Sequence, residues 1–242
     1  MTDARKGSLS ETVSREVLTH IQTNRLQTGA VLPSENQLAE QLGISRGIVR
    51  EAVRGLANLG VIEVGNGRRP RVGRLDGDVL ALLTDYAVQT EQVTVQQTLD
   101  VRRVLEVRAV HLAALHRSEA EARAIAAALF ALRSPEIIAA LREAMGDYDL
   151  MTRHDIEFHV LVAAASRNPL LRLQVESFRY VIERTGPIGW KSRPDEEAVR
   201  TQVEIHGEIA AAISARDPQL ASRLMTKHFT DTVSVLSQAG FN

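Results

Sequence analysis

The chain has 242 residues, 44% hydrophobic and 24% charged, a composition typical of a folded globular protein that excludes a disordered one. It has no cysteine, no apolar run near the roughly 18 residues of a membrane span and no signal-peptide core, so we expect a cytoplasmic protein without disulfides, thiolate zinc sites, thiol catalysis or a membrane partner. The net charge of −1 conceals an asymmetry, because residues 1–75 carry 11 Lys and Arg against 7 Asp and Glu, whereas the rest carry 18 against 23.

The first two predicted helices lie in the basic N-terminal part. Apolar residues at helical spacing indicate a helix over residues 10–25, with Gly29 just past it as a stop signal. A second helix follows Ser34, whose side chain can cap it while Gln37 reaches back to complete a capping box. Gly43 is expected to end this helix.

A third helix and a hairpin come next. Ser45 is expected to cap the helix, Gly60 to stop it, and its predicted buried face consists of Val49, Ala52, Val53, Leu56 and Leu59. Residues 61–64 and 70–72 are predicted to be two short strands joined by a tight turn. Helices joined by a short turn and followed by a hairpin make a winged helix-turn-helix domain, to which we assign residues 1–74 and which we call the head.

Two groups of arginines indicate that the head binds double-stranded DNA. Arg46, Arg50 and Arg54 fall at i, i+4 and i+8, so they form one stripe on the third helix, where an arginine can bond a guanine edge in the major groove. The second group lies in the wing beside Gly67, where the backbone can approach sugar and phosphate: Arg68, Arg69 and Arg71. The alternative, a merely solvated helix face, does not explain why the fold, the stripe and the wing coincide.

Residues 33–62 contain Pro-Ser-Glu-x-x-Leu-Ala-x-x-Leu-Gly-Ile-Ser-Arg-x-x-Val-Arg-Glu-Ala. This run resembles the DNA-binding domain of the GntR family of bacterial transcription regulators. The resemblance assigns base-edge contacts to Arg46 and Arg50, and it places other residues at phosphates or at the wing tip: Ser34, Glu35 and Gly67. Asn36 stands where many relatives carry a DNA-contacting arginine, so that role is not transferred to it.

Residues 78–242 form the second predicted domain, which we call the body. The segment is rich in Ala and Leu and is predicted to fold into about seven helices, with residues 73–77 as the linker. Capping signals punctuate it at Ser118 with Glu121, Ser134-Pro135, Asn168-Pro169, Arg193-Pro194 and Asp217-Pro218. The predicted fold is therefore mainly α: an N-terminal winged helix-turn-helix domain and a C-terminal all-helical bundle.

Four polar residues interrupt the apolar faces of the predicted body helices. Asp155 and His159 lie at i and i+4, so both project from one face, and His206 and His228 each interrupt an apolar stripe on a later helix. A single inward histidine is usually a hydrogen-bonded core residue. Four such groups would be costly to bury unpaired, and one cation would remove that cost. Three imidazoles and a carboxylate suit a divalent transition metal, zinc first, then nickel, cobalt, manganese or iron.

The remaining histidines lack this setting and are predicted to be structural or exposed: His20, His111, His116 and His154.

The body, over roughly residues 78–235, resembles the FCD-type C-terminal domain of the FadR subgroup. The resemblance rests on Asp-x-x-x-His at 155–159, Ser-x-Asn-Pro at 166–169 and the two later histidines. It implies that Asp155, His159, His206 and His228 hold the ion, and that Arg102, four residues before Glu106, faces an effector cavity. A guanidinium beside a metal is a carboxylate receptor, and the alternative for Arg102 is an ordinary ion pair.

Three functional hypotheses follow. The first is a transcription regulator, a repressor by resemblance, that binds a pseudo-palindromic operator as a homodimer and responds to a small carboxylic acid bound next to the metal. In the second, the metal itself is the signal. The third, a metallohydrolase with a DNA-binding appendage, is disfavoured because Glu157 is not placed like the base of a His-Glu-x-x-His motif. We therefore predict no catalytic residues.

Overall fold

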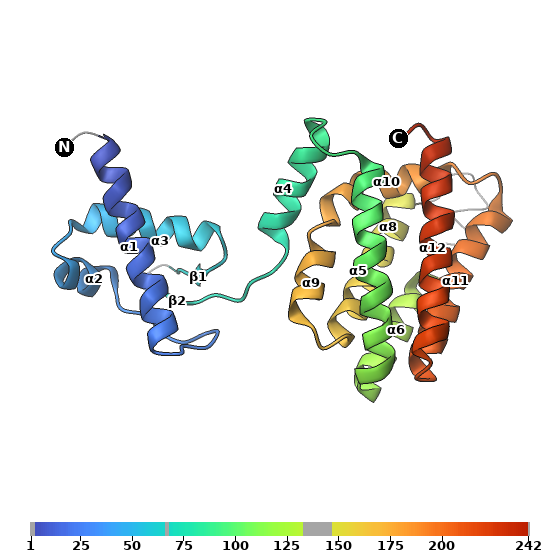
Figure 1. The fold of residues 1–242 in the computed structure, drawn as a ribbon, viewed down its shortest axis with the longest axis horizontal. Coiled ribbons are helices and arrows are strands. Elements are labelled where there is room, and N and C mark those ends of the chain that lie inside the picture. Colours follow the sequence, from blue (N-terminus) through green and yellow to red (C-terminus); the bar gives the residue numbers. More distant parts are fainter. Residues whose placement is uncertain (1–2, 66–67, 133–146, 242) are drawn as a thin grey trace. The chain divides into compact units, whose positions relative to one another are not determined.

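The computed structural model describes residues 3–65, 68–132 and 147–241 (Figure 1). It divides into two compact units, Met1–Asp76 and Gly77–Asn242, which contain the head and the body respectively. The mainly helical fold is confirmed, since within the described residues the only β structure is a small hairpin in the head and an isolated antiparallel bridge between Val31 and Arg71.

The head consists of three helices and a hairpin, as expected of a winged helix-turn-helix domain. The elements are α1 (Asp3–Thr23), α2 (Glu35–Leu42), α3 (Arg46–Asn58), β1 (Ile62–Glu63) and β2 (Arg71–Val72). The two strands are antiparallel, with Ile62 opposite Val72. α3 packs against both α1 and α2, and its buried side chains join those of Val13, Val17 and Leu38 in one apolar core. This core fixes the orientation of α3, so its opposite face is directed to solvent.

The boundaries of α2 are those that the sequence predicts. The backbone N–H of Gln37 donates to Ser34 Oγ at 3.3 Å, and Gln37 Oε1 accepts from the Ser34 N–H at 2.9 Å, which completes the capping box. Gly43 ends the helix with a left-handed φ of 64°, a conformation that a side chain with a Cβ adopts only under strain.

Three local predictions in the head need correction. Helix α1 begins at Asp3 instead of residue 10, because polar residues extend a helix at little cost once it is nucleated. Ser45 occupies the N-cap position of α3, but its side chain makes no capping hydrogen bond. Leu59 is 54% exposed, because the helix ends at Asn58 and the chain turns away there, which takes this side chain off the buried stripe.

The body is an all-helical bundle. Its described helices are α4 (Asp78–Gln89), α5 (Val95–His116), α6 (Glu119–Leu132), α8 (Tyr148–Ala165), α9 (Pro169–Glu176), α10 (Arg179–Lys191), α11 (Glu196–Ser214) and α12 (Pro218–Gln238). The long helices α5 and α12 pack along each other, and α8 lies against α5, α6, α9 and α10. The main core of buried apolar side chains runs between them, including Phe158, Ile209, Ile213, Met225 and Phe229. A smaller second cluster consists of Ala109, Ala163, Leu171 and Val175.

Most of the predicted helix starts in the body are observed. Ser118 and Glu121 hydrogen-bond reciprocally at the start of α6, and Asn168 and Asp217 cap α9 and α12, each followed by a proline in the first turn. Helix α11 begins at Glu196, and its cap is the side chain of Asp195, two residues after Arg193. The predicted start at residues 134–135 lies outside the described residues. None of the helices in the described ranges has both the length and the apolar character needed to cross a bilayer.

Candidate metal centre and DNA-binding surface

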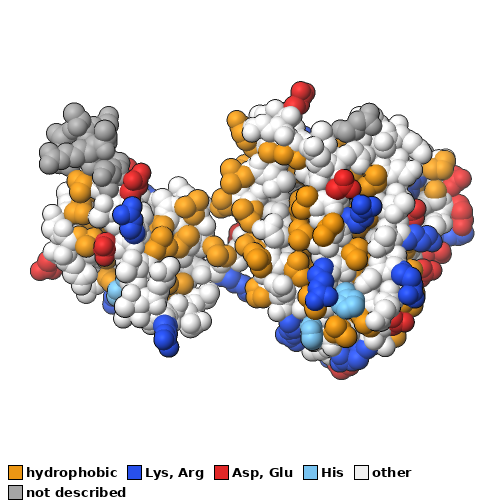
Figure 2. Space-filling model, in the orientation of Figure 1, with side chains coloured by type: hydrophobic (Ala, Val, Ile, Leu, Met, Phe, Trp, Pro, Cys, Tyr) orange, Lys and Arg blue, Asp and Glu red, His pale blue; other side chains and the backbone are white. Residues whose placement is uncertain are grey.

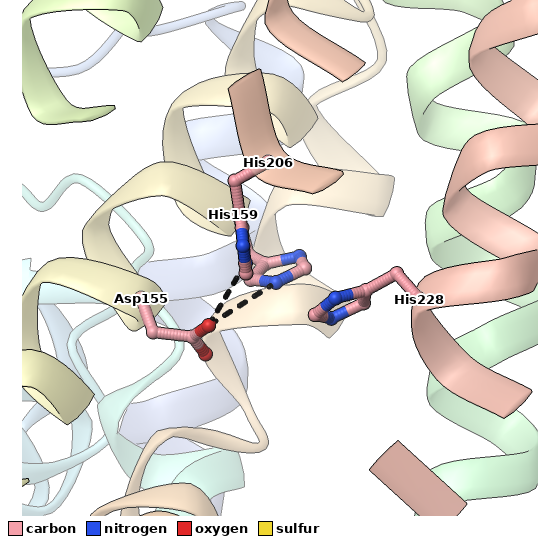
Figure 3. A group of neighbouring side chains, drawn as sticks. All are labelled: Asp155, His159, His206 and His228. Carbon is pink, nitrogen blue, oxygen red and sulfur yellow. Dashed lines mark ion pairs between the residues drawn. The ribbon is translucent and has the colours of Figure 1, made fainter. Parts of the chain in front are cut away.

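Four buried side chains from three helices converge inside the body. Asp155 and His159 come from α8, His206 from α11 and His228 from α12, and one ligand atom of each lies within 4.8 Å of those of the others. Figure 3 shows the carboxylate and the three imidazoles pointing toward one another. The side chains predicted to share an ion are therefore brought together by the fold.

Hydrogen bonds fix the protonated nitrogen on two of these imidazoles. His206 Nδ1 lies 2.8 Å from the backbone carbonyl of Gln202, which can only accept, so this nitrogen carries the proton. His159 Nδ1 likewise donates to the carboxylate of Glu106. In the neutral form of each ring Nε2 then carries a lone pair, and neither buried Nε2 has a hydrogen-bond partner among the described residues.

The two orphaned nitrogens face a carboxylate oxygen. His206 Nε2 lies 3.0 Å and His159 Nε2 3.9 Å from Asp155 Oδ1 (dashed in Figure 3). A lone pair aimed at a carboxylate oxygen is repulsive, whereas a cation between them would be attracted to both. The residues thus fit a divalent metal ion. Glu106 accepts a hydrogen bond from the His159 nitrogen that does not face the cluster, a contact that commonly orients metal-binding histidines.

The protonation states of the cluster also suit a metal. Burial opposes ionisation of Asp155, but the positive charges of Arg102 and of His159 and His206 in their protonated forms outweigh it and hold the pKa of this carboxyl well below its usual range. A metal ion at the same place would act in the same direction. Burial, reinforced by the neighbouring His206 and His159, lowers the pKa of His228 well below its ordinary value, so this imidazole is neutral near pH 7. An ionised carboxylate and an unprotonated imidazole are the forms that bind metal ions.

Arg102 and Glu106 form a buried ion pair on α5, which the sequence analysis weighed as the alternative role for Arg102. Arg102 Nε lies 2.5 Å from Glu106 Oε1, and the two side chains are 5% and 1% exposed. The pair does not use the whole guanidinium, because Arg102 Nη2 is buried without a hydrogen-bond partner. An orphaned charged donor of this kind is a candidate binding group for an anion.

Glu106 is a functional residue that the sequence analysis missed. Its carboxylate accepts from both Arg102 and His159, and these two neighbours outweigh its burial and keep its pKa below the ordinary value. The i, i+4 spacing from Arg102 was visible in the sequence, but the contact with His159 depends on the packing of α5 against α8. Through this one carboxylate, the metal cluster and the arginine are positioned together.

A cavity of about 50 Å³ opens beside the cluster. It is bounded by α5, α8, α10, α11 and α12, and most of its wall is apolar. Its polar lining consists of Arg102, Asp155, His228, Gln202, Arg193 and the hydroxyls of Thr98, Thr185 and Thr232. Two metal-ligand candidates and the Arg102 side chain therefore line one small cavity.

Two further polar residues near the cluster in sequence or on the same helix as Arg102 do not line the cavity. Glu157 is exposed, and its Oε2 lies 3.8 Å from Nδ1 of the half-buried His154. Arg103 pairs with Asp100 at 3.5 Å on the surface. Glu157 therefore does not face the metal cluster.

The recognition stripe of the head is exposed as predicted. Arg46, Arg50 and Arg54 all point to solvent from α3, and no ion pair engages them within the described residues. The buried face of the same helix consists of Ile48, Val49, Ala52, Val53 and Leu56. Ser34 and Glu35 are half-buried at the start of α2. The stripe therefore has free guanidinium groups available for a polyanion.

The wing arginines are placed differently from one another. Arg68 is exposed, Arg69 Nε donates to the Leu32 carbonyl at 3.1 Å, and Arg71 Nη1 donates to the Gly29 carbonyl at 2.7 Å. Two of the three guanidinium groups thus tie the base of the wing to the loop before α2. Gly67, the predicted wing tip, lies outside the described residues.

Each of the two units matches a model of a known protein family. Residues 9–72 match the family model described as bacterial regulatory proteins, gntR family, and residues 97–231 match the FCD domain. The chain belongs to the GntR family. Its C-terminal FCD domain places it in the FadR subgroup, and it is a DNA-binding transcription regulator, not an enzyme.

Individual relatives cover nearly the whole chain. It is 30% identical to the HTH-type transcriptional regulator LutR of Bacillus subtilis (strain 168), over 90% of this chain and 96% of the relative. It is 29% identical to the HTH-type transcriptional repressor NanR of Salmonella newport (strain SL254), over 93% and 84% of the two chains. Among solved structures, a Streptococcus agalactiae GntR covers 93% of this chain and 99% of its own, with a TM-score of 0.61 at 22% identity, a likeness of fold.

Proposed function

We propose that this regulator is a metal-loaded repressor whose operator binding is released by a small carboxylic acid. The observation that carries the proposal is the cavity in which Arg102 meets the cluster of Asp155, His159, His206 and His228. A repressor named NanR is among the relatives. A repressor would act on operator DNA, so we propose a cytoplasmic site of action. Zinc is the first ion to test, before nickel, cobalt, manganese and iron.

Different residues of the cavity would bind the metal ion and the carboxylate group of the acid. Asp155 and the three histidines would hold the metal, which supplies an electrophilic position for one oxygen of the acid when it is bound. Arg102 would donate Nη2, the atom left free by Glu106, to a carboxylate oxygen. The apolar wall of the cavity excludes water and so strengthens this ion pair.

The head would read DNA through its α3 stripe. Arg46 and Arg50, at the N-terminal end of the stripe, would contact base edges, while Ser34, Glu35 and Arg68 would lie toward phosphates together with Gly67, Arg69 and Arg71 of the wing. Acid binding can weaken operator binding only by the difference in its affinity for the two states of the protein.

A homodimer is supported by an exposed apolar surface on the body. Figure 2 shows hydrophobic side chains gathered over α4 and α5. The residues of this surface are Leu82, Leu83, Tyr86, Val101 and Val104, each more than half exposed. Patches of this kind mark interfaces, and a two-fold dimer would match a pseudo-palindromic operator. We expect Val104→Asp to convert the dimer into a monomer in sedimentation experiments, whereas Val31→Asp, at an exposed valine of the head, should leave it dimeric.

The decisive experiment combines thermal shift and operator binding. Zinc-loaded protein is screened against small carboxylic acids, and each acid that raises the melting temperature is added to a complex with operator DNA. Release of DNA by such an acid, lost in Arg102→Gln, would support the proposal. DNA affinity that follows metal occupancy and ignores every acid would instead make the metal the signal.

A further inference from the structure

A second guanidinium lines the same cavity as Arg102. Arg193, just beyond the end of α10, contributes to the cavity wall, whereas Arg102 contributes from α5. Its guanidinium carbon lies 4.7 Å from the centre of the Trp190 ring, and Nη1 donates to the Gly189 carbonyl at 2.6 Å. The ring and the carbonyl hold this side chain in place before any ligand arrives.

The charge of Arg193 is not neutralised by a close partner. No carboxylate of the described residues forms an ion pair with it, although the more distant Asp155 and Asp231 attract its charge. Burial lowers its pKa to about 10, so it remains a cation near neutral pH at the cost of desolvation. A half-buried cation with spare donors is a poor structural element and a good anion receptor.

The charges around the cavity favour one class of anion. The formal charges of Arg102, Arg193, Glu106 and the ionised Asp155 sum to zero, so a divalent metal would give this group of residues a net charge of plus two. A monocarboxylate neutralises one of these two charges, whereas a dicarboxylate neutralises both. Because an uncompensated charge is costly in a water-poor site, the second carboxylate contributes directly to affinity.

We propose that the effector is a compact dicarboxylate, with one acid group held by Arg102 beside the metal and the other by Arg193. The inference rests on the proposed function and names its ligand class. The cavity volume of about 50 Å³ is room for roughly four water molecules, which favours an acid of a few carbon atoms over a sugar acid.

Calorimetric titration of zinc-loaded protein with matched acids tests this assignment. Succinate should bind about 10- to 100-fold more tightly than butyrate, the four-carbon acid with a single carboxylate. Arg193→Gln should bring succinate down to the affinity of butyrate while leaving butyrate binding and zinc content unchanged. Lys191→Gln, which removes an exposed charge from the end of the same helix, should change neither acid.

The controls separate this inference from the proposed function. Arg102→Gln should weaken both acids alike, because it removes the receptor for the group that they share, and Arg193→Lys should retain part of the preference for succinate. Equal binding of succinate and butyrate to the wild type overturns the dicarboxylate assignment and leaves a monocarboxylate sensor intact. A preference for succinate that survives Arg193→Gln overturns the assignment of Arg193 as the receptor for the second acid group. Failure of malonate, succinate, glutarate and butyrate alike to bind would reject both proposals for acids of this size.

Discussion

The head and the body use arginine in opposite ways. On α3, Arg46, Arg50 and Arg54 stand in solvent with no ion pair in the described structure, whereas Arg102 in the body is buried against Glu106. An exposed charge adds little to folding stability and is free to meet phosphates, but a buried one must be compensated within the fold. Substitutions of the exposed α3 arginines should therefore alter DNA binding alone, and those around Arg102 should alter ligand binding and stability together.

Among the substitutions that test this difference between head and body, we expect the largest effect from Glu106→Gln. The substitution removes the charge that balances Arg102 and replaces the acceptor for His159, so we expect a loss of about 3–5 kcal/mol in the free energy of unfolding. Zinc affinity should fall about 10- to 100-fold, the usual effect of losing such an outer contact. Chemical denaturation and competition with a chelator measure the two losses.

The matched control for that variant is Glu157→Gln on the exposed side of α8. Its free energy of unfolding should change by no more than about 0.5 kcal/mol. An equally small change in the free energy of unfolding of Glu106→Gln would mean that this buried carboxylate does not connect the metal cluster to Arg102.

The next largest effect is expected from His228→Ala. Removal of this buried side chain should cost about 2–5 kcal/mol of stability, and the zinc content of the purified protein should drop with it. Chelator should lower the melting temperature of the wild type but not of the variant, because an ion bound only by the folded state stabilises it. Mass spectrometry of the native protein reports the zinc content.

His111→Ala serves as the comparison, since this half-buried histidine lies outside the cluster, with its Nδ1 3.4 Å from Ser222 Oγ. It should keep its zinc. Full zinc content in His228→Ala would remove that residue from the metal site.

In the head, Arg50→Ala should lower the affinity for DNA without changing the stability of the fold. We expect a loss of about 1–3 kcal/mol in affinity for the operator, with much less change for random DNA and an unaltered melting temperature. Arg15→Ala removes an exposed arginine of α1 and should spare the difference between operator and random DNA. Equal losses on both DNAs in Arg50→Ala would mean that it contacts phosphate only.

The smallest expected effect belongs to Ser34→Ala at the start of α2. Loss of the hydroxyl that accepts from the Gln37 N–H should cost about 0.5–2 kcal/mol of stability in the head. Thermal unfolding of the full chain should show the loss in the head transition and leave zinc binding in the body unchanged. A shift in the body transition instead would contradict the independence of the two units.

The sequence by itself determined the local features of both units. The capping box at Ser34, the stop at Gly43, the caps at Asn168 and Asp217 and the shared face of Asp155 and His159 all follow from spacings within one or two helical turns. Such features are set by backbone hydrogen bonds among near neighbours, and so a pattern of residue types is enough to predict them.

Only the tertiary structure decided how distant helices share their side chains. It placed α11 and α12 so that His206 and His228 complete the cluster begun on α8, and it gave Glu106 its second partner. It also turned Leu59 outward and brought Arg193 to the cavity of Arg102. These outcomes depend on packing between segments far apart in the chain, a nonlocal energy that no spacing within a single helix encodes.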